Sequence, residues 1–213
     1  MRLLPNESKQ VASLLEVLIS GEELARDCAR AQAELARDRL MRRFFLAQAR
    51  QESFHVGVFH ALLLALSPKG AGGSWNALAL ARYRRLIEGA LARGDLGETL
   101  IAQQVILEGL GEVVLTHLDR GMGKRKIGIE RLHRLVLSQE QAHHGFGLSR
   151  LEQMVTNGQT SRGRLQEQAG EYLSIIDSLL AELSEVFEIF DEDPVAYASE
   201  TRCHLPHWLG GAA

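Results

Sequence analysis

The sequence predicts an all-α protein in which two helical hairpins, joined by a long connection, form a four-helix bundle. Apolar residues recur with a helical period along most of the 213 residues, and the strict alternation of a strand is rare. Only 4 prolines occur in the whole chain. Two long periodic stretches are each broken by one short turn, at residues 37–38 and 121–124, as expected of hairpins.

The elements follow from caps and breakers in chain order. A first helix begins near Asn6 or Ser8 and reaches about residue 37, where Asp38 can cap a second helix over residues 39–66. The Pro- and Gly-rich run at 67–73 ends that helix, and a short connecting helix follows over 74–93. Asp95 caps a third helix to about residue 119, and a fourth spans about 128–155. A fifth helix over 161–190 precedes an irregular tail, 191–213. We expect one domain, 1–213, with its bundle core at about 8–156.

Composition narrows the class of protein. The 46% hydrophobic content suffices for one sizeable core, and the net charge of -3 gives no general attraction to nucleic acid. The first ten residues have no apolar signal core, and no uncharged apolar run approaches the length of a membrane span. Cys28 and Cys203 lie far apart and form no disulfide framework, so we expect a cytoplasmic protein without a membrane partner.

The motif Gln-Glu-x-x-His-x-Gly occurs twice, at residues 51–57 and 139–145. Residues three apart share a face of a helix, so Glu52 and His55 point the same way, as do Glu140 and His143. A lone Glu-x-x-His carries little information, and a third copy stands at residues 130–133. The other residues at the height of each copy therefore decide whether that copy is a metal-binding motif.

Hairpin register supplies that test. Glu22 and Glu52 lie symmetrically about residue 37, and Glu108 and Glu140 about residue 124, so each pair is expected at one height in its hairpin. Glu130 lies ten residues before Glu140, about 15 Å away along a helix, and is assigned to the helix start. Bundles that bind two metals draw one Glu from each of two helices and a Glu-x-x-His from each of the other two. The predicted metal ligands are Glu22, Glu52, His55, Glu108, Glu140 and His143.

Buried carboxylates need counter-charge, and two divalent cations would neutralise four glutamates. Oxygen-rich ligation with two imidazoles suits iron or manganese. The alternative is that these glutamates lie on solvated faces and that the histidines are core residues. Glu23 is a neighbouring candidate for the place of Glu22, although the helical stripe favours Glu22.

This set of residues resembles the ligands of the ferritin-like dimetal-carboxylate superfamily over residues 8–156. That group includes bacterioferritin, rubrerythrin, the ribonucleotide reductase small subunit, bacterial multicomponent monooxygenases, a tRNA hydroxylase and cyanobacterial aldehyde-deformylating oxygenase. The resemblance implies a ferritin-like fold with a crossover helix, two iron ions, manganese or a mixed pair remaining open, and oxygen chemistry. The chain lacks the Cys-x-x-Cys of rubrerythrin, and its four bundle helices hold no Tyr for a stored radical.

Further residues are assigned around the ligands. Several oxygenases of this superfamily have Asp before each Glu-x-x-His, where this chain has Gln51 and Gln139, so we expect these residues, together with Glu112, to contact and orient the metal ligands. Gly109 and Gly111 either make room for a substrate, permit a local bulge or allow close helix packing. The segment 203–208 carries Cys and His, but with few candidates and one Pro it is a weak metal site.

The expected function is a diiron oxidoreductase, of the monooxygenase or hydroxylase type, that activates dioxygen to oxidise a small or chain-like organic substrate. Electrons would come from an external donor such as a ferredoxin, for which clusters at Arg37, Arg39, Arg42 and Arg43 and at Arg82, Arg84 and Arg85 offer basic surfaces. A homodimer is compatible with this reading. The alternatives are a ferroxidase, an iron-handling or peroxide-scavenging protein, and a helical interaction module whose site is vestigial.

Overall fold

The structure of the protein is a computed structural model that describes residues 5–66, 78–123 and 130–210. Those residues form helices joined by turns and short connections, so the predicted all-α class is confirmed. Two compact units make up the chain. Unit 1 comprises Met1–Glu88 and Ile175–Pro194, and unit 2 comprises Gly89–Ser174 and Val195–Ala213. The expectation of one domain stays a prediction.

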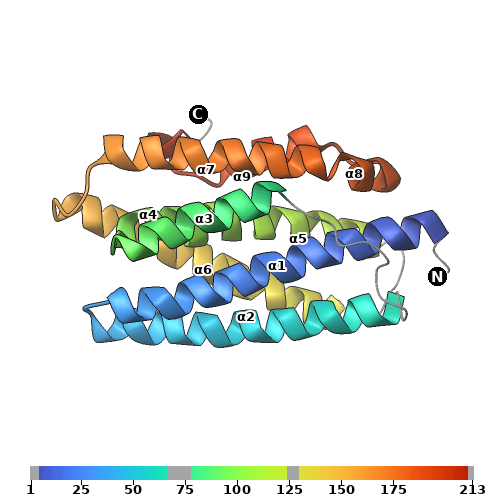
Figure 1. Cartoon of the computed structure of the whole chain (residues 1–213), viewed down its shortest axis with the longest axis horizontal. Coiled ribbons are helices and arrows are strands. Elements are labelled where there is room, and N and C mark those ends of the chain that lie inside the picture. The colour runs from blue at the N-terminus through green and yellow to red at the C-terminus, as the bar shows by residue number, and fades with distance from the viewer. Residues whose placement is uncertain (1–4, 67–77, 124–129, 211–213) are drawn as a thin grey trace. The chain divides into compact units, whose positions relative to one another are not determined.

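Unit 1 is built on the hairpin of α1 (Pro5–Leu35) and α2 (Arg39–Leu66), drawn in blue and cyan in Figure 1. Asp38 caps α2 as predicted, because its Oδ1 accepts the backbone N–H of Leu40 at 2.8 Å. The apolar stripe of α1 is buried with residues of α2. The buried side chains of these two helices include Leu15, Leu24, Ala25, Cys28, Ala29, Met41, Phe45 and Ala49.

Two further helical segments of unit 1 pack on α1. In α3 (Leu78–Ala92), Arg84 donates to the backbone carbonyl of Ser20 at 3.4 Å. In α8 (Ser184–Phe190), Glu185 accepts from Gln10 at 3.0 Å. The helix predicted in the long connection is therefore present as α3, while the breaker at 67–73 lies outside the described residues.

Unit 2 contains α4 (Leu96–Leu100), the π-helix η1 (Ile101–Leu107), α5 (Glu108–Gly123) and α6 (Glu130–Thr156). Asp95 caps α4 as predicted, since its Oδ1 accepts the N–H of Glu98 at 3.2 Å. The third helix expected from the sequence is interrupted by η1, in which the N–H of Glu108 reaches the carbonyl of Gln103, five residues back.

The end of the chain is more ordered than expected. The predicted fifth helix is divided at Leu183 into α7 (Arg162–Glu182) and α8. The expected irregular tail is wrong for its first part, because α9 (Pro194–Cys203) and the short 3₁₀-helix η2 (His207–Leu209) lie there. Pro194 opens α9 at a position where its missing N–H is harmless, and Tyr197 and Thr201, one turn apart, are buried.

The stretch Leu96–His117 is long and apolar enough to span a membrane by length and composition. However, 72% of its most apolar window is buried within the fold. That degree of burial is typical of a helix in a protein core, so the expectation that the chain has no membrane span remains the simpler interpretation.

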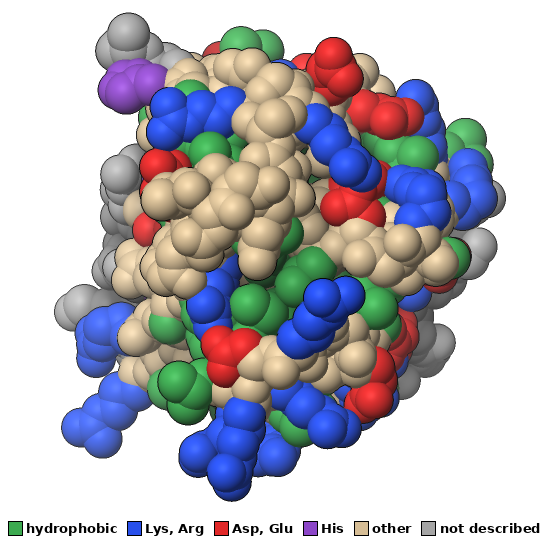
Figure 2. Space-filling model, turned by 90° about the vertical axis from the view of Figure 1, so that its left-hand side faces the viewer, with side chains coloured by type: hydrophobic (Ala, Val, Ile, Leu, Met, Phe, Trp, Pro, Cys, Tyr) green, Lys and Arg blue, Asp and Glu red, His purple; other side chains and the backbone are tan. Residues whose placement is uncertain are grey.

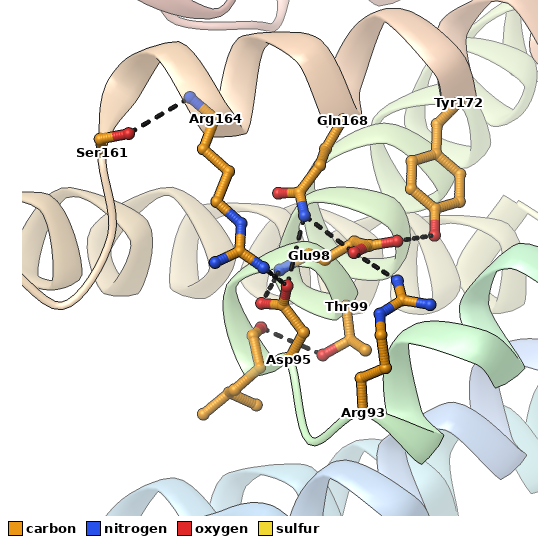
Figure 3. A network of polar contacts seen from close by, with 9 residues as sticks. Arg93, Asp95, Glu98, Thr99, Ser161, Arg164, Gln168 and Tyr172 are labelled. Atoms are coloured by element: carbon orange, nitrogen blue, oxygen red, sulfur yellow. Dashed lines mark hydrogen bonds and ion pairs between the residues drawn. The ribbon is translucent and has the colours of Figure 1, made fainter.

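A polar network fastens α4 to the first part of α7 within unit 2 (Figure 3). Glu98, 7% exposed, accepts hydrogen bonds from Arg93 at 2.8 Å, from Gln168 at 2.8 Å and from the Tyr172 hydroxyl at 3.1 Å. Arg164 donates to Asp95, the residue that caps α4. The start of the helix that leads into η1 is thereby held in place.

Replacing Glu98 by Ala is expected to lower the free energy of unfolding by about 1–3 kcal/mol, because it leaves the buried Tyr172 hydroxyl without its acceptor and removes the shorter of the two hydrogen bonds from Gln168. Glu167→Ala, at an exposed position of α7, is the control. Urea denaturation of both variants measures the difference. Equal midpoints would show that the network adds no stability.

Candidate metal centres

Unit 1 brings together three of the six predicted ligands. The Nδ1 atom of His55 lies 3.2 Å from Glu22 Oε2 and 3.0 Å from Glu52 Oε2. Glu52 and His55 are both 0% exposed, and the Glu22 side chain is 14% exposed. Glu22 therefore faces the histidine at the same height of the α1–α2 hairpin, as the register predicted. The oxygens and the imidazole lie within ligating distance of a common point.

Unit 2 brings together the other three. Glu108 Oε2 lies 3.5 Å from Nδ1 of His143, and Glu140 forms a side-chain hydrogen bond with Glu108. All three residues are at most 3% exposed. Residues of η1 and α5 meet α6 in antiparallel order, because Gly147 adjoins Gln104 and His133 bonds the carbonyl of Leu115. Neither Glu22 nor Glu108 points outward, which counts against a vestigial site.

The acidity of Glu108 reflects opposing effects. Burial raises its pKa, whereas the hydrogen bond with Glu140, the charge of His143 and the amide of Gln103 lower it. The lowering effects prevail and bring the pKa of Glu108 to about 2. A hydrogen bond between two carboxyl groups needs one proton, and a metal ion would replace that proton at the same oxygens.

The buried amide of Gln103 contacts this cluster and was not identified from the sequence. Its Nε2 donates to Glu108 Oε1 at 2.9 Å, and the side chain is 0% exposed. Residues five apart do not share a face of an α-helix, but η1 brings them together. Gly147 lets α6 approach η1, because a Cβ built there would lie 2.5 Å from Cβ of Gln104.

The residues expected to orient the metal ligands have different surroundings. Gln51 and Gln139 are half-buried on α2 and α6, and their role beside the histidines stays a prediction. Glu112 accepts from Gln141 at 3.0 Å and lies 3.7 Å from His144, whose pKa is lowered chiefly by burial. Glu112 thus faces a different histidine from the predicted ligand His143.

The two glycines beside Glu108 lie against side chains of α6. A Cβ on Gly109 would be 3.8 Å from Nε2 of His144, and one on Gly111 would be 3.4 Å from Oε2 of Glu140. Of the three uses considered for these glycines, close helix packing is the one that the structure supports. The π-helical bulge is present, but it precedes Glu108.

The third Glu-x-x-His copy, at residues 130–133, makes a structural contact between helices. His133 is buried and its Nε2 lies 2.7 Å from the carbonyl oxygen of Leu115, which ties α6 to α5. The helix α6 begins at Glu130, the position expected from the register argument.

No protein-family model and no curated protein matches the chain. Among solved structures, it is similar to "Protein 19 with aldehyde deformylating oxidase activity" from Synechococcus, with a TM-score of 0.83 and 19% sequence identity. The match covers 99% of this chain and 94% of that one. The predicted ferritin-like fold, with a helix in the crossover and a helix after the bundle, is thereby confirmed.

Gly147→Ala is expected to destabilise the protein by about 1–3 kcal/mol, because the added methyl group collides with Gln104 in η1. Gly145→Ala is the matched control on the same helix, since a Cβ there meets nothing within 4 Å. It should be neutral or stabilising by up to about 1 kcal/mol. Thermal unfolding of both variants provides the measurement, and equal stabilities would contradict the close approach.

The stability of the metal-free protein is expected to depend on pH through Glu108. Because the folded pKa of Glu108 lies below its ordinary value of 4.5, its ionised form contributes stability above that pH and loses it as pH falls toward about 2. Between pH 5 and pH 3 the wild type should therefore lose more stability than Glu108→Gln, by on the order of 1–2 kcal/mol. Urea denaturation at the two pH values measures this.

Glu171→Gln, at an exposed position of α7, is the control and should follow the wild type. An equal pH dependence in Glu108→Gln and wild type would contradict the lowered pKa.

Proposed function

We propose that the protein is an oxidoreductase that uses two iron ions to activate dioxygen for the oxidation of an organic substrate. Each unit would supply two carboxylates and one imidazole to one ion. The ligands are Glu22, Glu52 and His55 in unit 1, and Glu108, Glu140 and His143 in unit 2. The observation that carries the proposal is this repeated pairing of buried glutamates with one histidine.

The donor set of each cluster fits a divalent transition metal. Buried carboxylates are stabilised by cations, and two carboxylates with a neutral imidazole suit iron or manganese better than softer metals. The hydrogen bond between Glu108 and Glu140 supports a site in which both carboxylates face one cation. The fold is one in which facing helices supply Glu and Glu-x-x-His to a metal pair.

The residues of this chain would have distinct roles. His55 and His143 would each anchor one ion, and the glutamates would balance its charge. Gln103, donating to Glu108 Oε1, would fix which oxygen of that carboxylate faces the metal. The iron ions would supply dioxygen binding and reduction. The buried position of both clusters would keep water from the oxidising centre.

Electrons would have to come from another protein in a cytoplasmic setting. Arg37, Arg39, Arg42 and Arg43 are all exposed around the turn between α1 and α2. Figure 2 views the end of the molecule that carries this turn and shows basic side chains along its lower edge. Such a surface would attract an acidic electron donor such as a ferredoxin. Arg84 of the second basic cluster is engaged with the backbone of α1, and Arg42 of the first cluster pairs with Glu34 at 3.4 Å, so Arg37, Arg39 and Arg43 are the first residues to test for docking.

The solved structure with this fold has aldehyde deformylating oxidase activity, so linear aldehydes are the first substrates to test. Purified protein loaded with Fe²⁺ is expected to consume dioxygen and aldehyde when a chemical or ferredoxin-based reducing system is present. Iron oxidation and mineral growth without any organic substrate would favour the ferroxidase alternative instead.

Metal content tests the site directly. Protein reconstituted with Fe²⁺ without oxygen should hold two ions per chain, and His55→Ala should lose at least one because an anchoring imidazole is removed. His60→Ala is the matched control, since His60 is exposed on the same helix. Elemental analysis after desalting gives the counts.

Glu22→Ala and Glu23→Ala form a second matched pair, in which only the first should reduce metal content. Mössbauer spectroscopy of the wild type would reveal whether the two ions are magnetically coupled. A protein that retains no iron under these conditions would contradict the enzymatic proposal as well as the ferroxidase alternative.

A further inference from the structure

A second set of metal-ligating side chains gathers within unit 2, separate from the six proposed ligands. It consists of Glu112 on α5, His144 on α6 and His204, which directly follows α9. Each offers one ligand atom, and these atoms all lie within 4.8 Å of one another. Nothing in the spacing of residues 112, 144 and 204 along the chain shows that they meet.

The position of His204 is fixed by contacts on both sides of it. Before it, His117 of α5 lies 3.1 Å from Glu200 and has its ring 4.4 Å from that of Tyr197. After it, Leu205 and Leu209 are buried at 5% and 3% exposure. The packing of its neighbours thus places the histidine beside α5.

The distances within the cluster suit coordination better than hydrogen bonding. Glu112 Oε2 lies 3.4 Å from Nδ1 of His204 and 3.7 Å from Nδ1 of His144. In a tetrahedral zinc site, with bonds of about 2.0–2.1 Å, neighbouring ligand atoms are roughly 3.4 Å apart. Direct hydrogen bonds would be shorter, at about 2.7–3.2 Å.

The His144 side chain is largely buried, and its ring is stacked on that of His204 at 5.8 Å between centroids. Its Nδ1 atom is the one that lies 3.7 Å from Glu112 Oε2. In a neutral imidazole the nitrogen without a proton can coordinate a cation, so a metal ion at this point would bind Nδ1.

We propose that Glu112, His144 and His204 bind one divalent transition-metal ion of the zinc class, in addition to the dimetal centre. Two imidazoles and one carboxylate match the donors that zinc accepts. The His204 side chain is 31% exposed and that of Glu112 is 16% exposed, so a water molecule can complete the coordination and the ion can enter from solvent. The ion would fasten the end of the chain to the α5–α6 hairpin.

The test compares two histidines of the same segment in the full-length protein. Metal-free wild type, His204→Ala and His207→Ala are titrated with Zn²⁺, and the bound metal is counted after desalting. His207 is exposed and lies outside the cluster. We expect His204→Ala to bind one equivalent fewer than the wild type, and His207→Ala to bind as much as the wild type.

Two additional measurements keep the outcome interpretable. Glu112→Gln, on another helix, should lose the same single equivalent as His204→Ala. Zn²⁺ should also slow proteolysis of the segment after residue 194 in wild type and His207→Ala but not in His204→Ala. Equal zinc content in His204→Ala and His207→Ala would overturn the proposal. Failure of the dimetal centre would appear differently, as a His55→Ala variant that retains the full metal content.

Discussion

The burial of carboxylates beside imidazoles is the constraint on which the rest of this structure depends. Glu52, Glu108 and Glu140 are at most 3% exposed, and a charged group in such a place destabilises the fold unless something balances it. Each unit has the same arrangement around these carboxylates. A histidine lies one helical turn after a glutamate, and a second glutamate comes from the facing helix. The two helices of each hairpin therefore have to be long and in register at this height.

Much of this arrangement could be predicted from the sequence because it depends on local rules. Asp38 and Asp95 act as caps, and α2 begins one residue after Asp38 as expected. The partnership of Glu22 with His55 follows from distances to a turn, which are fixed by the rise of the helix. The ferritin-like fold could also be predicted from the sequence, because two helical hairpins joined by a helical connection allow few topologies.

What the sequence did not reveal depends on contacts between distant segments or on irregular backbone. Gln103 was missed because residues five apart lie about 140° from each other around an α-helix, and only the π geometry of η1 brings it onto Glu108. Helix α9 was missed because its buried faces, at Tyr197 and Thr201, gain stability from packing rather than from a strong local pattern. The approach of His204 to Glu112 is likewise a tertiary contact.

The π-helical segment η1 changes how this chain aligns with other helical proteins. A π turn accommodates one residue more than an α turn at nearly the same helix length, so η1 is equivalent to a single-residue insertion. The residues of α5, from Glu108 onward, are therefore rotated about the helix axis relative to their positions in an uninterrupted α-helix that starts at Leu96. A relative without this segment should align with the chain only if a one-residue gap is placed between Ile101 and Leu107. Alignments that forbid gaps inside helices would pair Glu108 with the wrong residue.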